Sequence, residues 1–133
     1  LKRMGGGSNP LTANVLSIFC RRGWLEPHLN FIRSFYKEKR DVMFKSLEAY
    51  MPEIISWTKP NGGFFVWLKL PANVKAEEVA ARAEAAGVLV LPGNSFFTKI
   101  HSSSYLRLAF SYLAKDRIEE GIEKLARVIK SLL

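Results

Sequence analysis

The segment Pro-Asn-Gly-Gly at residues 60–63 most constrains the fold of this chain, because it separates two apolar runs. Asn-Gly is the pair that tight hairpin turns prefer, since both turn positions need positive φ angles. The flanking runs EIISWTK and FFVWLKL are rich in β-branched and aromatic residues, which favour strands. The sequence therefore predicts an antiparallel pair formed by residues 54–58 and 64–70, turned at Asn61-Gly62.

A further strand is predicted at 105–110, where the segment YLRLAFSY (105–112) carries a single charge, Arg107. Alternation puts Arg107 on one face of this strand and a row of apolar residues on the other. The apolar face must be buried. Taken alone, the octapeptide favours a solvent-facing Arg107. The alternative is a pocket floor, where the planar guanidinium would bind a carboxylate or phosphate. The apolar row comprises Leu106, Leu108, Phe110 and Tyr112, and the opposite face Tyr105, Arg107, Ala109 and Ser111.

Helical patterns fill most of the remaining chain. Apolar spacing predicts a helix within 9–23 that Gly23 ends, and a second from Pro27 to about Tyr50, long enough to be a strut between two bodies. An alanine-rich helix should end at Ala86, and a final helix carries Gly121, which we expect to allow close packing.

The run VLVLPG (88–93) is continuously apolar, so it predicts a strand buried on both faces. The order of elements predicts an α+β fold: a small mixed sheet with an antiparallel hairpin, covered by helices and preceded by the long strut helix. The final helix has Ile118, Ile122, Leu125, Ile129 and Leu132 at helical spacing.

Composition excludes several classes of protein. The net charge of +8 raises nucleic acid as a partner, but residues 37–41 interleave both signs of charge, as a solvated helix face does. No apolar run reaches the ~18 residues of a membrane span. The single cysteine, Cys20, suits a reducing compartment, and we expect a cytoplasmic protein. His28 and His101 have no metal-ligand spacing to each other or to Cys20, so no metal site is predicted.

Four segments, in this order and spacing, resemble one family. They are KPNGGFFVWLKLP, GVLVLPGNSFF, YLRLAFS and RIEEGIEKLARVI. Together they resemble the C-terminal part, with the small domain, of the pyridoxal-phosphate-dependent class I/II (fold type I) aminotransferases. Within this family, the sequence most resembles the branch of 2-aminoadipate and kynurenine transaminases.

The resemblance implies a role for Arg107. In the family, the arginine of the LRLAFS strand binds the α-carboxylate of the substrate, an amino acid or a 2-oxo acid. Ser8 and Asn9 are similar to a segment that reaches the mouth of the active site near the neighbouring subunit, and Asn94 is a further candidate there. Where the aspartate-type branch has an arginine for a distal carboxylate, this chain has Met4. A dicarboxylate preference is therefore unsupported.

The family's chemistry needs a lysine that forms a Schiff base with pyridoxal phosphate. The resemblance places that lysine upstream of the matched segments. The stretches SFYK (Ser34–Lys37) and SWTK (Ser56–Lys59) imitate its motif but lie in the long helix and beside the hairpin turn. We therefore expect no catalytic residue and no bound cofactor in this chain alone.

The resemblance also implies a domain organisation and partners. Residues 1–24 would be a strip of the large cofactor domain, 25–51 the connecting helix and 52–133 the small domain. The chain would then be a fragment, a proteolytic remnant or a separate subunit, missing its N-terminal large domain, of a parent that acts as a homodimer.

Two alternatives remain open. NGGFFVWL resembles the ribonucleoprotein octamer of RNA-recognition motifs, but that octamer needs its aromatic residues on one strand face. Here Phe64 lies on one face of the predicted strand with Val66 and Leu68, while Phe65 and Trp67 point to the other face. The second alternative is a non-catalytic interaction or amino-acid-sensing domain that keeps the fold without the chemistry.

Overall fold

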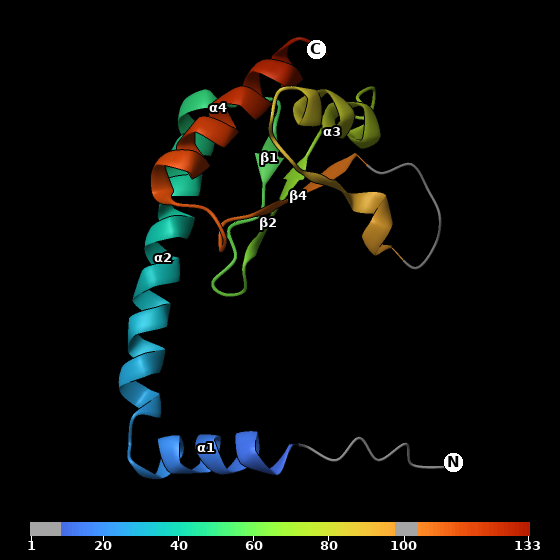
Figure 1. Ribbon diagram of the computed structural model, residues 1–133. Coiled ribbons are helices and arrows are strands. Elements are labelled where there is room, and N and C mark those ends of the chain that lie inside the picture. Colours follow the sequence, from blue (N-terminus) through green and yellow to red (C-terminus); the bar gives the residue numbers. More distant parts are fainter. Residues whose placement is uncertain (1–8, 98–103) are drawn as a thin grey trace, which may run out of the picture. The chain divides into compact units, whose positions relative to one another are not determined.

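The computed structural model describes residues 9–97 and 104–133 (Figure 1). Two helices come first, and short strands and further helices follow; the long helix predicted from Pro27 to about Tyr50 is present. No helix in the described ranges is long and apolar enough to cross a membrane. The elements are α1 (Pro10–Arg21), α2 (Leu25–Tyr50), β1 (Ser56–Trp57), β2 (Phe65–Lys69), α3 (Ala76–Ala85), β3 (Leu91–Pro92), the 3-10 helix η1 (Gly93–Phe96), β4 (Tyr105–Ala109) and α4 (Lys115–Lys130).

The chain divides into two compact units, Leu1–Phe35 and Tyr36–Leu133, with the boundary inside α2. In the first unit, α1 has Pro10 in its first turn and ends before Gly23, whose φ of 71° confirms the predicted stop. No side chain of α1 is buried, and Leu11 is 72% exposed. The apolar face predicted for this helix is therefore largely uncovered in the chain as it stands.

The second unit contains a four-stranded sheet with the order β1-β2-β4-β3. The α+β class is confirmed, but the expected mixed sheet is wrong, because each pairing is antiparallel. A parallel pair needs a crossover of a dozen or more residues, usually a helix. The chain instead passes from β3 through η1 to β4, and β4 returns alongside β3 in the opposite direction.

The predicted hairpin is present, since β1 pairs with β2 in antiparallel register. The tight turn at Asn61-Gly62 is wrong: in this segment positive φ occurs at Gly63 (81°), whereas the predicted turn needs it at both central positions. Pairing stops at Thr58, whose hydroxyl accepts the Trp67 N–H at 3.0 Å. Pro60 lacks an N–H and cannot extend the ladder, so a wider loop connects the strands.

The run at 88–93 is not a strand buried on both faces. Only Leu91 and Pro92 pair, at an edge of the sheet, and Leu89 is 77% exposed. An edge position tolerates Pro92, which cannot donate to a further strand. A continuous apolar run predicts burial only if neighbours cover both faces, and β3 has a strand on one side.

Helices cover one face of the sheet. In Figure 1, α4 lies beside the C-terminal half of α2, and an O–H···O bond of 3.2 Å from Tyr50 to Glu119 joins them. Burial of apolar surface at ~25 cal/mol per Å² stabilises this arrangement. The largest fully buried side chains are Leu47, Val66, Leu68, Val79, Leu106, Phe110, Leu125 and Ile129.

Two details of the predicted packing are wrong. Tyr112 is 89% exposed, because β4 ends at Ala109 and its alternation does not continue. Gly121 does not allow a close approach, since a Cβ added there would meet nothing within 4 Å. Leu132, at the end of the apolar row of α4, is half-buried.

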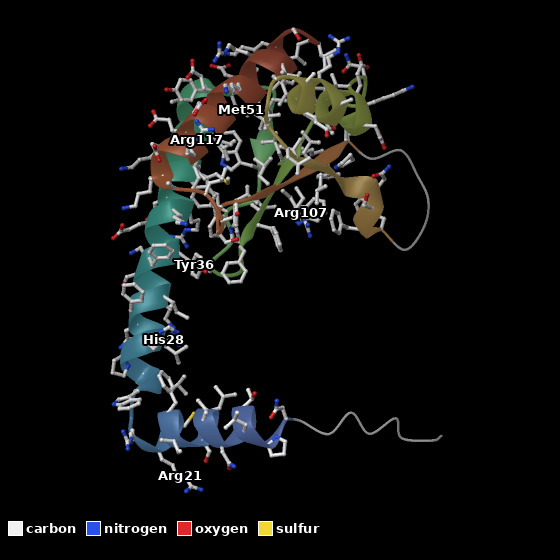
Figure 2. The ribbon with its side chains drawn as sticks, in the orientation of Figure 1. Arg21, His28, Tyr36, Met51, Arg107 and Arg117 are labelled. Atoms are coloured by element: carbon white, nitrogen blue, oxygen red, sulfur yellow. The ribbon has the colours of Figure 1, made fainter. Side chains whose placement is uncertain are left out.

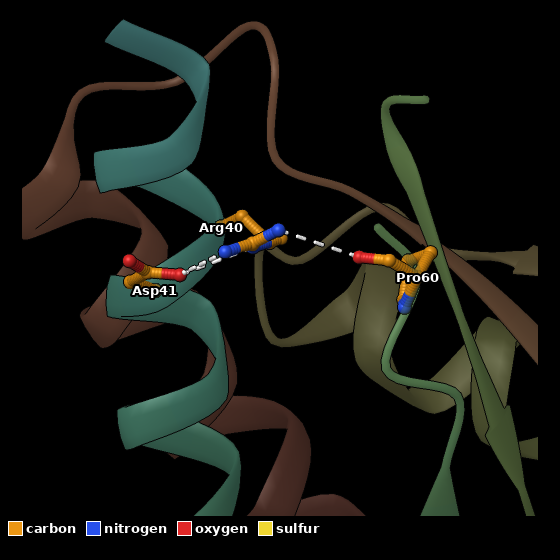
Figure 3. A network of polar contacts seen from close by, with 3 residues as sticks. All are labelled: Arg40, Asp41 and Pro60. Atoms are coloured by element: carbon orange, nitrogen blue, oxygen red, sulfur yellow. Dashed lines mark hydrogen bonds and ion pairs between the residues drawn. The ribbon is translucent and has the colours of Figure 1, made fainter. Parts of the chain in front are cut away.

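Polar side chains of α2 tie this helix to the sheet. Lys39, the polar interruption of its apolar face, is buried and donates to the Ser111 carbonyl at 3.0 Å. Arg40 binds Asp41 at 2.8 Å and reaches the Pro60 carbonyl at 3.5 Å in the hairpin loop (Figure 3). A charged group buried in this way needs such partners.

We expect Lys39→Met to lower the free energy of unfolding by about 1–3 kcal/mol, because the Ser111 carbonyl would lose its charged donor. The matched control is Lys37→Met, at an exposed position of the same helix, which should change stability by less than about 0.5 kcal/mol. Urea unfolding followed by circular dichroism measures both. Equal effects of the two substitutions would contradict the structural role of Lys39.

Candidate active site

The face of the sheet opposite the buried core carries Arg107. Leu106 and Leu108 point into the core, so the alternation of β4 puts Arg107 on the opposite face, as predicted. Figure 2 shows its side chain extending from β4 toward η1. The strand is fixed from both sides, since Trp67 and Leu91 are the register partners of Arg107 in β2 and β3.

Two phenyl rings contact the Arg107 guanidinium. Its Cζ atom lies 4.1 Å from the ring centroid of Phe65 and 3.9 Å from that of Phe96. Both distances are within the range of cation–π attraction, worth about 0.5–1 kcal/mol at exposed sites and more where water is excluded. The rings therefore restrict a side chain that is otherwise long and flexible.

Further aromatic rings continue this surface. Trp67 lies edge-on to Phe96, with centroids 5.7 Å apart and planes at 87°, and contacts Tyr105 at 6.4 Å. Phe65 and Trp67 share a strand face, as the alternation in the sequence indicates. The result is an aromatic surface around one cation.

Arg107 has no carboxylate partner in the described part of the chain. The ion pairs found there join other residues, such as Lys115 with Glu38 and Lys59 with Glu48. The guanidinium is half-buried and has five N–H donors in a planar fork. These donors can bind an external anion, and a carboxylate fits their geometry bidentately.

A hollow of about 450 Å³ lies beside Arg107, between the edge segment 87–91 and the start of α4. Its lining is mostly apolar and includes Ala109 and Gly121. Arg117, Glu120 and Lys124 of α4 also line it. The glycine thus leaves space in this hollow instead of allowing two elements to approach.

The charges of α4 at this hollow satisfy one another. Glu120 pairs with Lys124 at 2.7 Å and with Arg117. The hydrogen bond from Lys124, together with the positive charge of Arg117, holds the pKa of Glu120 below its ordinary value. Glu120 thus pairs with both cations of α4 that line the hollow, whereas Arg107 takes part in no ion pair found among the described residues.

The other predicted site residues have structural contacts. Asn94 Nδ2 donates to Glu77 at 2.6 Å and so ties η1 to α3. Asn9 Oδ1 accepts the Leu11 N–H at 3.0 Å and caps α1. Asn9 belongs to the first unit and Arg107 to the second. Ser8 lies outside the described residues, so a place for Ser8 and Asn9 at the mouth of the site stays a prediction.

The lysines of the two Ser-x-x-Lys stretches do not make a cofactor site in this structure. Lys37 is exposed on α2, and Lys59 is exposed and ion-paired with Glu48. Neither lines the hollow. Lys124 does line it but is ion-paired with Glu120. Pyridoxal phosphate needs a lysine amine next to donors for its phosphate, and these three lysines do not fit this group.

The remaining candidates are possible metal ligands, the single cysteine and the two histidines. Among the described residues, no cluster of His, Cys, Asp and Glu could hold a metal ion. Cys20 is exposed on α1, and His28 packs edge-on against the ring of Phe19 at 6.0 Å. His101 lies outside the described ranges.

The sequence did not reveal the two rings on Arg107. Phe65 reaches it because β2 and β4 pair in a register that puts Phe65 opposite Ala109, and no local pattern specifies that register. Phe96 lies in a stretch that reads as a polar, aromatic-bearing loop. The sequence shows the aromatic residues, but it does not show that Phe65 and Phe96 contact the same guanidinium.

Comparisons with known proteins show what this chain is similar to. The family model "Aminotransferase class I and II" matches residues 2–125. The chain is 43% identical over 108 residues to aromatic-amino-acid aminotransferase 1 of Thermococcus litoralis, covering 81% of this chain and 26% of that protein. It thus spans about a quarter of the length of such curated relatives.

Solved structures show the same fold. Kynurenine aminotransferase from Pyrococcus horikoshii superposes with a TM-score of 0.83 at 42% identity, over 86% of this chain and 28% of that one. The alpha-aminoadipate aminotransferase of Thermus thermophilus, solved with N-(5'-phosphopyridoxyl)-L-leucine, gives 0.81 at 34% identity, over 89% of this chain and 30% of that one. With its α+β unit and the family match over most of its length, the chain belongs to the class I and II aminotransferases.

Proposed function

We propose that this chain is the substrate-carboxylate-binding part of a pyridoxal-phosphate-dependent transaminase, which transfers an amino group between an amino acid and a 2-oxo acid. The observation that carries the proposal is Arg107. This arginine stands on the sheet face opposite the core, contacts two rings and has no carboxylate partner in the described part of the chain. The family match supports the reaction class.

In this proposal Arg107 binds the α-carboxylate through two parallel N–H···O bonds. A bidentate pair fixes both the position and the orientation of the carboxylate. Orientation matters, because a substrate held in one geometry reaches its transition state at a lower entropic cost. The sheet supplies rigidity, since Arg107 lies in the middle of β4 with a paired strand on each side.

In this proposal, residues outside this chain hold the cofactor and supply the lysine that forms its Schiff base. When bound, pyridoxal phosphate acts as the electron sink of transamination. The described residues here do not fit it, so they are assigned substrate binding alone. The proposed parent is a homodimer whose large domain holds the cofactor, with Ser8, Asn9 and Asn94 near the mouth of the site.

We expect Arg107→Lys, made in the full-length protein, to lower kcat/KM for an amino acid roughly 10–150-fold. This range corresponds to about 1.5–3 kcal/mol for one lost charge-assisted hydrogen bond. Lysine keeps the charge and the long stem but cannot form the bidentate fork. Arg107→Ala should lose more. Steady-state kinetics measures both, and circular dichroism checks the fold.

The control is the amine that corresponds to the amino acid without its carboxylate. Turnover of this amine should fall much less in both variants, because Arg107 then has no partner to orient. If Arg107→Ala left amino-acid turnover within twofold of the parent, the assignment would be wrong. Carboxylate-dependent binding without turnover by the full-length protein would instead favour the amino-acid-sensing alternative.

The 133-residue chain alone should not hold pyridoxal phosphate at a specific lysine. Lys59 is already ion-paired with Glu48, and Lys37 is an exposed side chain of α2. Incubation with the cofactor, borohydride reduction and peptide mass spectrometry should find scattered, substoichiometric labelling. One lysine labelled at unit stoichiometry would show that this chain contains the cofactor site.

A further inference from the structure

We propose that Phe65 and Phe96 are positioning residues that hold the Arg107 guanidinium in its carboxylate-binding orientation; this inference rests on the proposed function of Arg107. Both ring centroids lie about 4 Å from Arg107 Cζ, at 4.1 and 3.9 Å. Arginine has considerable rotamer freedom, and a ligand that must order it loses affinity. Rings that order it beforehand remove that cost.

Phe65 reaches Arg107 through the sheet register. It pairs with Ala109, two residues along β4 from Arg107, and so lies on the same face of the neighbouring strand. Such diagonal neighbours are within reach of long and aromatic side chains. Phe65 is 40% exposed and lies outside the core, so its contact with the arginine is not a by-product of core packing.

Phe96 reaches Arg107 from η1, which is itself anchored. The Asn94–Glu77 bond of 2.6 Å ties this short helix to α3, and Trp67 packs edge-on against the Phe96 ring at 5.7 Å. Phe96 is 41% exposed. The ring is thus fixed by two contacts while its own surface remains half open. This assigns Asn94 an indirect role, as the anchor of the segment that carries Phe96.

Arginine stacks on aromatic rings with the flat face of its guanidinium, and distances of 4.1 and 3.9 Å from Cζ to the ring centroids suit such stacking. Cation–π contacts use the face of an aromatic ring, whereas a carboxylate binds the N–H donors in the guanidinium plane. The contacts therefore do not compete. Carboxylate binding and ring contact can be simultaneous at Arg107.

The test is a mutant cycle in the full-length protein loaded with its cofactor. Phe65→Leu and Phe96→Leu should each lower kcat/KM for an amino acid by about 2–5-fold, the range expected for one exposed cation–π contact. The corresponding amine should be turned over within about twofold of the parent. Phe96→Tyr keeps a ring and should restore amino-acid turnover.

The decisive readout is non-additivity. Residues that act through one another show coupling, whereas independent residues add. On an Arg107→Ala background, Phe96→Leu should have no further effect on amino-acid turnover. A purely structural role of Phe96 would persist on that background and would lower turnover of the amine as well, and either result would overturn the proposal.

Phe64→Leu is the matched control. Phe64 is the neighbour of Phe65, is similarly exposed at 44% and packs against the Tyr36 ring at 4.8 Å. This substitution should leave kcat/KM unchanged for both the amino acid and the amine. If Arg107→Ala selectively impairs the amino acid but neither ring variant does, the positioning role is wrong and the carboxylate site stands. If Arg107→Ala itself leaves amino-acid turnover unchanged, both the positioning role of the rings and the carboxylate site are wrong.

Discussion

The alternation of side chains along β4 is the constraint on which the described site depends. Leu106 and Leu108 are buried between the sheet and its helices. Because successive side chains of a strand point to opposite faces, their burial forces Arg107 onto the face opposite the core. A slip of one residue would exchange the two sets, leaving a guanidinium in the core and two leucines in water. The same apolar burial that stabilises the fold therefore also decides which face of the sheet carries Arg107.

The sheet and its surroundings then determine what the arginine can do. Phe65 from β2 and Phe96 from η1 contact its guanidinium, while the ion pairs found among the described residues join other cations, such as Lys115 and Lys59. Glu120 binds Arg117 and Lys124 at the neighbouring hollow. A guanidinium packed on rings, with no carboxylate partner among the described residues, suits a ligand carboxylate. The family match adds that the chain belongs to the class I and II aminotransferases.

Much of the architecture could be predicted from local patterns. The helices, the antiparallel pairing of β1 with β2 and the face of Arg107 follow from periodicities that each segment carries in itself. Lys39 illustrates the limit. It lies within residues 37–41, whose interleaved charges are typical of a solvated helix face, yet it is buried, and its partner, the Ser111 carbonyl, lies far along the chain. Local pattern indicates that a buried polar group needs a partner and cannot say which one.

The sequence by itself determined the helices, the pairing of β1 with β2 and the buried face of β4, because each of these depends on residues close together in the chain. Arg107 became the candidate through the resemblance to a family, since its own segment favours a solvent-facing side chain. Only the tertiary structure decided that the sheet is antiparallel throughout its described pairings, that Leu89 is exposed at an edge and that Gly121 borders a hollow. It also brought Phe65 and Phe96 to Arg107. Those outcomes depend on strand order and register, which are set by the summed packing of distant segments and not by any local pattern.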